Sequence, residues 1–538
     1  MQLDYVFAAQ KKPEINSPMH SHLSGLKPPY RLPGDTLYFH DWRYLRHGHP
    51  QSQWLTQQGE NLPIFQPEPV PEMRYEVCPY GRPGLRLRAV PAVKSGPVIA
   101  PHNSPFPFFL MPGNLIHDEG MYRFWLEVWP VESFGTQGIG RQNLVCYAES
   151  DNGFDWRFPE QGHIEHASAC ARHAVYGAPA AGGSLHGCGV FKDPSAPLEE
   201  RYKLIQQGTV SGDALETYLR ERPEDVQPSA VSADGREAFA ILGAVSSDGF
   251  HWQHIPEPLL LQRCDTHNLC EYDVTRGSYV AHVRDHIMSR RSVSRTESAD
   301  FRRFPRPLPV VYPGASAEHT DLWYSSGKNV MPGADESGAY HVMFPMRWDQ
   351  ATDLYDFSLA SSPDNLTWDF LPGGPVCVPG EPGDWDAGGV WAGSGMVHLP
   401  DNKMGLLYSG APVPHKHPRH HPYGGLAWAL WERDRLVALE VEDESGFGTW
   451  PLLTRCRRIR INHRTKDTGH IRVEVRDANG NALPGRTVDD CDPVRGNEYD
   501  RLITWRGESG LAVGTDVPIS LYVDLRHAEL FAIRFTEE

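Results

Sequence analysis

The stretch GAVSSDGFHW, residues 243–252, decides the fold, because its pattern occurs in three further places along the chain. YAESDNGFDW ends at Trp156, SVSRTESADFRRF ends at Phe304, and SLASSPDNLTW ends at Trp368. Each copy has an apolar segment, then Ser and an Asp or Asn in a turn, then an aromatic residue. A fifth segment, GGLAWALWERDRL from Gly424, keeps the apolar run and lacks the turn. Such self-similarity indicates repeated units that cannot bury their faces alone.

The repeated unit is larger than the signature itself. A pair of segments that predicts a β-hairpin precedes each signature, so the unit is a four-stranded sheet. Four-stranded sheets around an axis make a β-propeller, and the sequence predicts an all-β fold with five such blades. The inner hairpins are expected at residues 115–129, 187–208, 267–284, 322–347 and 385–410. A ligand site is then expected in the funnel at the axis.

Three parts follow along the chain in this interpretation. Residues 1–101 are Pro-rich and form an irregular N-terminal arm, whose segment 35–48 is expected to dock on the propeller. The five-bladed propeller spans 102–444, and a polar insertion at 211–237 is expected to be a loop with a short helix. From residue 445 the alternation of apolar and polar residues predicts a C-terminal β-sandwich, 445–538.

The composition argues against several classes of protein. A net charge of −17 disfavours nucleic-acid and anionic-membrane partners, since phosphate binding needs a basic surface. No run of about 18 apolar residues and no signal-peptide pattern occur, so a cytoplasmic protein is expected. The nine cysteines are scattered without a CxxC pair, which favours reduced thiols over a metal site. No cofactor motif appears, and the Pro-rich arm leaves a homo-oligomer open.

Several strings resemble the five-bladed β-propeller glycoside hydrolases, the group of invertases, fructanases, arabinanases and β-xylosidases. They are VFKDPSAPLEERYKL (190–204), DTHN (265–268) leading into RGSYVAHVR, TDLWY (320–324), GDWD (383–386), IRVEVRDANGNALPG (471–485) and DDCD (489–492). The likeness is closest to bacterial members with a C-terminal β-sandwich, and it covers nearly the whole chain after residue 100. It implies a glycoside hydrolase for a small oligosaccharide or glycoside of furanoside type, such as a fructoside or arabinoside.

The chain departs from the invertase pattern in the first hairpin. The Asn-Asp-Pro-Asn-Gly motif that supplies the nucleophile there would fall on residues 110–114, where Met111 replaces the acid. The second-blade Arg-Asp-Pro motif has a counterpart in Lys192-Asp193-Pro194, for which ordinary turn chemistry is the stronger explanation.

Breaking a glycosidic bond commonly needs two carboxyl groups, one to protonate the leaving oxygen and one to attack the sugar or activate water. Acids at the starts of inner strands are therefore candidates. Asp265 or Glu271 is the expected general acid/base, and Asp386 or Asp321 the expected base or nucleophile. Glu271 lies mid-strand among apolar residues, where a raised pKa would suit a general acid. Each acid could instead cap a loop or join two blades.

Sugar binding is assigned to polar and aromatic side chains at the same strand starts. His186, Asn268 and His319 are expected to hydrogen-bond sugar hydroxyls, with an acid/base role open to the histidines. Trp385, Trp391 and Tyr324 are expected to stack on apolar sugar faces. The histidine-dense run at 415–425 lacks zinc-ligand spacing, and no metal site is expected there.

Two other functions stay open. A propeller that binds carbohydrate without cleaving it is favoured by Met111 in place of the acid. A glycoside phosphorylase, an activity found in a relative of the same fold, would need a basic cluster in the funnel, for which Arg284 and Arg347 are candidates. Two carboxylates about 5–10 Å apart would favour hydrolysis, whereas acids scattered between blades would favour a binder.

Overall fold

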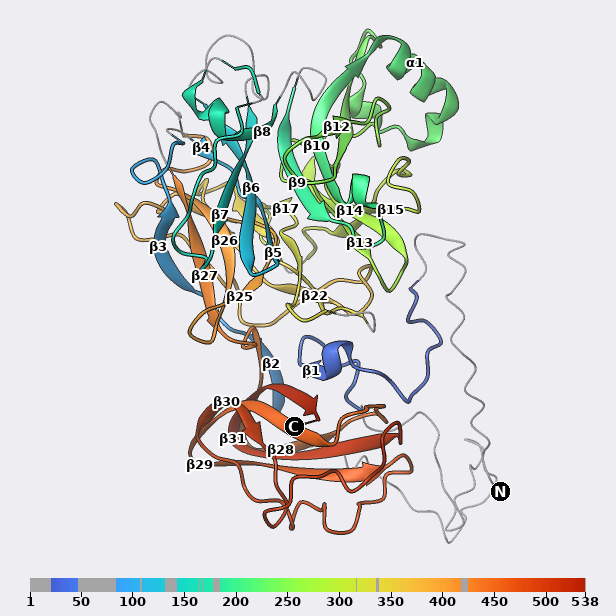
Figure 1. Ribbon diagram of the computed structural model, residues 1–538, viewed down its shortest axis with the longest axis vertical. Coiled ribbons are helices and arrows are strands. Elements are labelled where there is room, and N and C mark those ends of the chain that lie inside the picture. Colours follow the sequence, from blue (N-terminus) through green and yellow to red (C-terminus); the bar gives the residue numbers. More distant parts are fainter. Residues whose placement is uncertain are drawn as a thin grey trace.

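The computed structural model describes residues 21–46, 84–106, 109–130, 143–162, 164–166, 168–177, 184–315, 317–334, 338–417 and 424–537. These residues are almost all β, with one α-helix, α1 (Gly212–Glu221), in the insertion expected to carry a short helix. Figure 1 shows an upper part, which runs from β3 to β27, and a lower part built from the C-terminal strands. The prediction of an all-β protein is confirmed.

Three antiparallel sheets of the upper part follow one another along the chain. The first holds β4 (Phe109–Leu110) and β5 (Asn114–Asp118) beside β6 (Met121–Trp129), then β7 (Leu144–Ser150) and β8 (Ala174–Gly177). The second is β9 (His186–Lys192), β10 (Tyr202–Ser211), β11 (Glu237–Ser246) and β12 (Gln253–His254). The third is β13 (Leu269–Asp273), β14 (Ser278–Ile287), β15 (Arg290–Ser298) and β16 (Leu308–Val311). The pairs β5–β6, β9–β10 and β13–β14 are the hairpins expected from the sequence.

The next strands are interrupted by kinks, so each long strand is divided in two. They are β17 (Asp321–Ser325) with β18 (Lys328–Val330), β19 (His341–Met343) with β20 (Met346–Asp349), β21 (Tyr355–Phe357) with β22 (Ala360–Ser362), and β23 (Asp369–Phe370). The chain continues with β24 (Gly389–Ala392), β25 (Val397–Leu399), β26 (Lys403–Ala411) and β27 (Gly425–Glu432). The N-terminal strand β3 (Val93–Ile99) pairs with β27, so the arm contributes to this sheet and the expected boundary at residue 102 falls too late.

The repeated signature forms the same hydrogen-bonded turn at each copy. The Ser246 hydroxyl donates to the Asp248 carboxylate at 3.0 Å and accepts from the Gly249 amide at 2.9 Å. The carboxylate also accepts from the next two amides at 2.8 Å. Equivalent pairs occur at Ser150 with Asn152, Ser298 with Asp300, and Ser362 with Asp364. These contacts span three or fewer residues, which is why the sequence alone reveals them.

The turns also join neighbouring sheets. The Trp125 indole on β6 donates to the Gly249 carbonyl at 2.8 Å, and the Trp428 indole on β27 donates to the Gly153 carbonyl at 2.8 Å. Arg295 on β15 donates to the Asn365 carbonyl at 2.7 Å. The turn at Gly249 thus covers the sheet before it, and so does the turn at Asn365. The turn at Gly153, in the first sheet, covers the last sheet.

The inner strands meet at very short range. The Asn268 amide donates to the Gly187 carbonyl at 2.9 Å, and a Cβ added at Gly187 would lie only 1.6 Å from the Thr266 carbonyl oxygen. His267 Nε2 lies 3.1 Å from Oδ1 of Asn114, which links the third sheet to the first. Only glycine, which has no Cβ, allows this approach. The inner strands therefore pack directly against one another near their first residues.

The lower part is one sheet of long strands. Its members are β28 (Val437–Gly448), β29 (Arg458–Asp477), β30 (Asn497–Leu502), β31 (Ile519–Thr536) and, from the arm, β1 (Thr36–Tyr38) and β2 (Leu85–Ala89). The sheet begins at residue 437, earlier than the expected 445. Register shifts interrupt the pairing between β29 and β31, and the apolar residues of both strands enter a common core.

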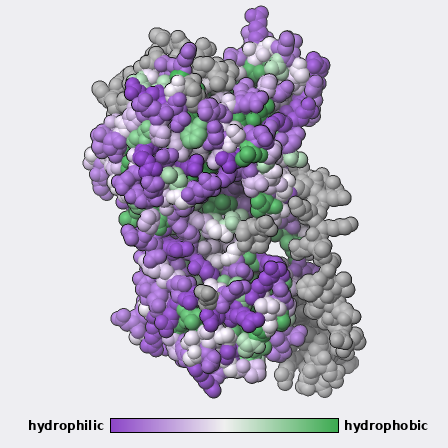
Figure 2. All heavy atoms as spheres, viewed as in Figure 1, coloured by the Kyte–Doolittle hydropathy of each residue, from purple (hydrophilic) through white to green (hydrophobic). Residues whose placement is uncertain are grey.

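The arm contacts both parts rather than the upper part alone. β1 pairs with β31, while the Tyr340 and Ser361 hydroxyls donate to the carbonyls of Thr36 and His40 at 2.7 and 2.6 Å. The face in Figure 2 is mostly hydrophilic. The eight cysteines within the described ranges are free thiols. No helix in the same ranges has the length and apolarity needed to cross a membrane.

Candidate functional site

The segment 264–268, which leads into the inner strand β13, exposes one acid. Its other four residues are at most 2% exposed, whereas the side chain of Asp265 is 42% exposed. The carboxylate forms an ion pair with Arg284 of β14. Burial would raise the pKa of Asp265, but the charges of Arg284, His186 and Arg291 outweigh it and hold the pKa below its ordinary value. Asp265 is therefore ionised at neutral pH, which suits a base or a nucleophile.

His186 begins β9 and lies between two acceptors. Its Nδ1 is 2.9 Å from Oε1 of Glu127, and the ring also hydrogen-bonds to the backbone of Asp265. Burial would lower the pKa of His186, but the negative charges of Glu127 and Asp265 outweigh it and raise the pKa. The pKa of His186 is thus raised and that of Asp265 is lowered. Opposite shifts of this kind in two neighbouring groups are the pattern of an acid–base pair.

Glu127 on β6 holds His186 in place. The buried carboxylate accepts hydrogen bonds from Trp129 at 2.6 Å, Asn143 at 2.8 Å, and the amides of residues 187 and 188 at 2.5 and 3.2 Å. Burial opposes ionisation, but these donors and His186 lower the pKa of Glu127. Glu127 was not predicted as a site residue. The available signal was a single carboxylate in the otherwise apolar end of the strand 121–129.

An aromatic cluster lies beside this pair. The Tyr324 ring centroid is 5.3 Å from that of Trp391 and 6.0 Å from that of Trp348. Trp129 joins the same buried cluster and lies 5.2 Å from the His186 ring. Tyr324 and Trp391 were expected here, whereas Trp129 and Trp348 were not, because their strands follow the inner ones.

Met111 packs in the same cluster and is 2% exposed. Its place in the first hairpin is the one where the invertase pattern has its acid. At this position the chain therefore brings an apolar side chain to the cluster in place of a carboxylate.

Asp321 begins β17 but points into an ion-pair network. Its side chain is 7% exposed, 3.6 Å from Arg347, and it accepts from the Glu318 amide at 3.1 Å. Arg347 also pairs with Asp356 at 2.5 Å. Burial, with the charges of Asp321 and Asp349, raises the pKa of Asp356 despite Arg347. Asp321 thus holds its own sheet together. His319 is exposed in the preceding loop.

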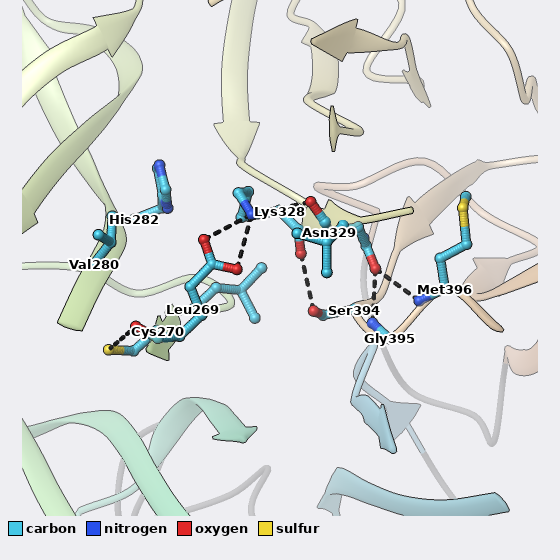
Figure 3. Close-up of a pocket in the computed structure, with 11 residues that line it drawn as sticks. Leu269, Cys270, Val280, His282, Lys328, Asn329, Ser394, Gly395 and Met396 are labelled. Atoms are coloured by element: carbon cyan, nitrogen blue, oxygen red, sulfur yellow. Dashed lines mark hydrogen bonds and ion pairs between the residues drawn. The ribbon is translucent and has the colours of Figure 1, made fainter. Parts of the chain in front are cut away.

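Glu271 lines a separate cavity of about 110 Å³. Lys328 lies 2.7 Å from its carboxylate, and Asn365 donates to it at 2.7 Å. Figure 3 shows Lys328 directed at that carboxylate and Asn329 bonded to the amides of Gly395 and Met396. Glu271 therefore joins the strands β13 and β18 rather than facing Asp265.

Asp386 is buried in the segment before β24. Lys94 of β3 and the Tyr408 hydroxyl both bind its carboxylate at 2.9 Å. Trp385 stacks on the Tyr408 ring at 5.7 Å, away from the aromatic cluster. The Asn268 side chain donates to the carbonyls of residues 187 and 266 at 3.0 and 2.9 Å, so it supports the inner strands.

The structure thus brings Asp265, His186, Tyr324 and Trp391 together and places Glu271, Asp321 and Asp386 elsewhere. The physical reason is that successive side chains on a strand point to opposite faces, so the start of a strand does not fix a side chain's direction. Of the other acids in the quoted motifs, Asp193 accepts from the Tyr279 hydroxyl at 2.7 Å, and Asp384 accepts from an amide in an exposed turn. Within the described ranges no group of three metal-ligating side chains occurs.

No protein-family model and no curated protein match the chain. Among solved structures, a GH32 β-fructofuranosidase from Bombyx mori is 10% identical, covering 81% of this chain and 95% of that one (TM-score 0.38). A GH130 structure, from a study of mannoside phosphorylases and glycoside hydrolases that target Candida mannan, is 11% identical, covering 64% and 94% (TM-score 0.40). An N-acetylgalactosamine deacetylase from F. plautii is 14% identical, covering 65% and 94% (TM-score 0.38). Glycoside hydrolases, the group that the sequence resembles, are thus among the structures that the chain resembles.

Proposed function

We propose that the chain is a glycosidase whose substrate lies beside Asp265, in the funnel of a five-bladed propeller. The turn contacts between successive sheets and the pairing of β3 with β27 support this arrangement of blades. The sheet from β28 onward is proposed as the C-terminal sandwich. The substrate class carried over from the sequence resemblance is a small oligosaccharide or glycoside of furanoside type.

The pairing of Asp265 with His186 is the observation that carries this proposal. Asp265, ionised and partly exposed, activates water or attacks the anomeric carbon, and the His186 imidazolium protonates the leaving oxygen. Glu127 orients the imidazolium from the opposite side, and its negative charge stabilises the protonated ring. The faces of Tyr324 and Trp391 flank the place where a sugar ring would lie.

A second candidate is a propeller that binds carbohydrate without cleaving it. Three of the four acids singled out from the sequence, Glu271, Asp321 and Asp386, are engaged in ion pairs within or between sheets. Asp265 would then only accept hydrogen bonds from sugar hydroxyls, with the aromatic cluster unchanged.

Proton NMR of the protein with aryl and natural furanosides and pyranosides separates these candidates. For a glycosidase, Asp265→Asn and His186→Gln lower the rate by about 10²- to 10⁴-fold, and Asp384→Asn, in an exposed turn, leaves it unchanged. The anomer formed first distinguishes retention from inversion. Line broadening of a sugar without turnover would overturn cleavage in favour of binding.

A further inference from the structure

Two arginines act on the Asp265 carboxylate of the proposed site, and a third stands close to it in the chain. Arg284 comes from β14, Arg291 from β15, and Arg263 stands two residues before Asp265. The Arg284 and Arg291 guanidinium groups both lie over the Tyr324 ring, at 5.8 and 4.1 Å, and that of Arg263 lies over the Phe239 ring at 5.0 Å. Burial lowers the pKa of Arg291, and the charges of Arg284 and Arg263 lower it further. Arg284 and Arg291 thus concentrate positive charge beside Asp265, in a chain whose net charge is −17.

Most of this positive charge has no protein partner. Arg284 pairs with Asp265, but its Nε has no hydrogen-bond acceptor. Arg291 lies over the rings of Tyr324 and Trp348, at 4.1 and 5.0 Å, and its Nη1 is buried without an acceptor. Among the residues that the structure describes, no carboxylate pairs with Arg291 or with the exposed Arg263.

Unpaired, partly buried guanidinium groups are costly, because desolvation removes water that no anion replaces. Their planar forks match the geometry of carboxylate and phosphate oxygens, which they bind by two parallel hydrogen bonds. Burying Arg284 and Arg291 with N–H groups that lack an acceptor is unfavourable for a site that takes only neutral sugars. The same arrangement becomes favourable once an oxyanion enters.

We infer that Arg263, Arg284 and Arg291 form an oxyanion subsite next to Asp265, so that the ligand is a carbohydrate accompanied by or carrying an anionic group. This inference rests on the proposed carbohydrate site. The oxyanion comes either from inorganic phosphate as a co-substrate or from the carboxylate of an acidic sugar.

Each source has a defined chemical consequence. Phosphate bound here attacks the anomeric carbon with one oxygen while the glycosidic C–O bond breaks, and the departing alcohol takes its proton from His186. The products are a sugar phosphate and the alcohol to which the sugar was attached, with no oxidant or reductant required. A uronate carboxylate binds the same arginines without reacting, and water then remains the nucleophile.

Isothermal titration of the full chain with inorganic phosphate, galacturonate, glucuronate, galactose and glucose tests the subsite. The anions bind more tightly than the neutral sugars, and Arg291→Gln weakens anion binding by about tenfold or more. Arg263→Gln, at an exposed position, gives a smaller loss in the same direction without risk to the fold. Arg455→Gln, whose side chain is 73% exposed and lies between β28 and β29 of the lower part, leaves the affinity unchanged.

Preference for phosphate identifies a co-substrate, and preference for a uronate over its neutral sugar identifies an acidic substrate. Equal affinity of anions and neutral sugars, or wild-type anion affinity in both Arg291→Gln and Arg263→Gln, overturns the inference. Anion binding without turnover of any glycoside would leave this subsite intact and reject cleavage. Turnover of neutral glycosides without anion binding would support cleavage and overturn the oxyanion subsite.

Discussion

Replacing Glu127 with Gln removes the buried charge that holds His186. Glu127 is 2% exposed and accepts five hydrogen bonds, one of them from an imidazole. The amide keeps one acceptor oxygen but turns two N–H donors toward groups that are themselves donors. Breaking a buried charge pair by removing one partner costs about 3–5 kcal/mol, and we expect Glu127→Gln to fall in this range.

The expected change in thermal midpoint follows from the size of the upper part. An unfolding entropy of about 2.1 cal/mol/K per residue makes about 0.7 kcal/mol/K for a unit of about 340 residues, so the midpoint falls by about 4–7 °C. Differential scanning fluorimetry at pH 7 measures this shift. NMR of the His186 ring gives a second readout, because the pKa of His186 should fall when the charge of Glu127 is removed.

The matched control is Glu160→Gln, whose side chain is 63% exposed and pairs with an exposed Arg172. We expect its midpoint to stay within about 1 °C of the wild type, since exposed pairs contribute about 0–1 kcal/mol. If Glu127→Gln melts as the wild type does and the His186 titration is unchanged, the assignment of Glu127 as the partner of a charged His186 is wrong.

Gly249→Ala should destabilise the second sheet by about 1–3 kcal/mol, because Gly249 has φ +81° and its new Cβ would lie 2.7 Å from the Trp125 ring; thermal midpoints measure the loss. Lys94→Met should cost about 2–3 kcal/mol by leaving Asp386 buried without its cation, a value reduced because Lys94 is 28% exposed; again the midpoint reports it. The raised pKa of His186 means that its charge stabilises the fold fully below about pH 6.5 and that this contribution is lost as the pH rises through the folded-state pKa. The midpoint difference between wild type and His186→Gln should therefore be largest in mild acid and shrink in alkali.

Matched controls keep these expectations specific. Gly235→Ala also introduces a side chain at positive φ (+68°) but meets nothing within 4 Å, so it isolates backbone strain from the clash at Gly249. Lys466→Met removes an exposed lysine with no ion pair among the described residues. A loss at Lys466 equal to that at Lys94 would contradict the role assigned to the Asp386 ion pair.

Much of the fold was predictable because its signals are short-range. The turn around Ser246 and Asp248 forms from residues that are neighbours in sequence, and the strands around it alternate with period two. The start of the lower sheet and the role of β3 were not predictable in this way. β3 pairs with β27, more than 300 residues later in the chain. Gly96 and Pro97 are unusual in strands, so the sequence of β3 resembles the irregular arm around it.

The candidate site likewise has residues that the sequence predicted and residues that depend on long-range contacts. Asp265 stood out at the start of an inner strand, and its carboxylate is the exposed one. Glu271 and Asp386 stood out for the same reason, yet Lys328 and Lys94 engage them, and neither lysine is near its partner in sequence. Glu127, which orients His186, lies in a second strand and gave no motif.

The sequence by itself determined the repeated turn, the all-β class, the inner hairpins and the presence of a short helix within 211–237, because each depends on local periodicity and turn chemistry. Only the tertiary structure decided which acid stays accessible and which are neutralised. Residues that meet at the inner strands come from segments 50 to 300 positions apart, and the direction of each side chain depends on register and on the partner that happens to face it. The contacts of His186 with Glu127 and Asp265 exist only once the first, second and third sheets lie side by side.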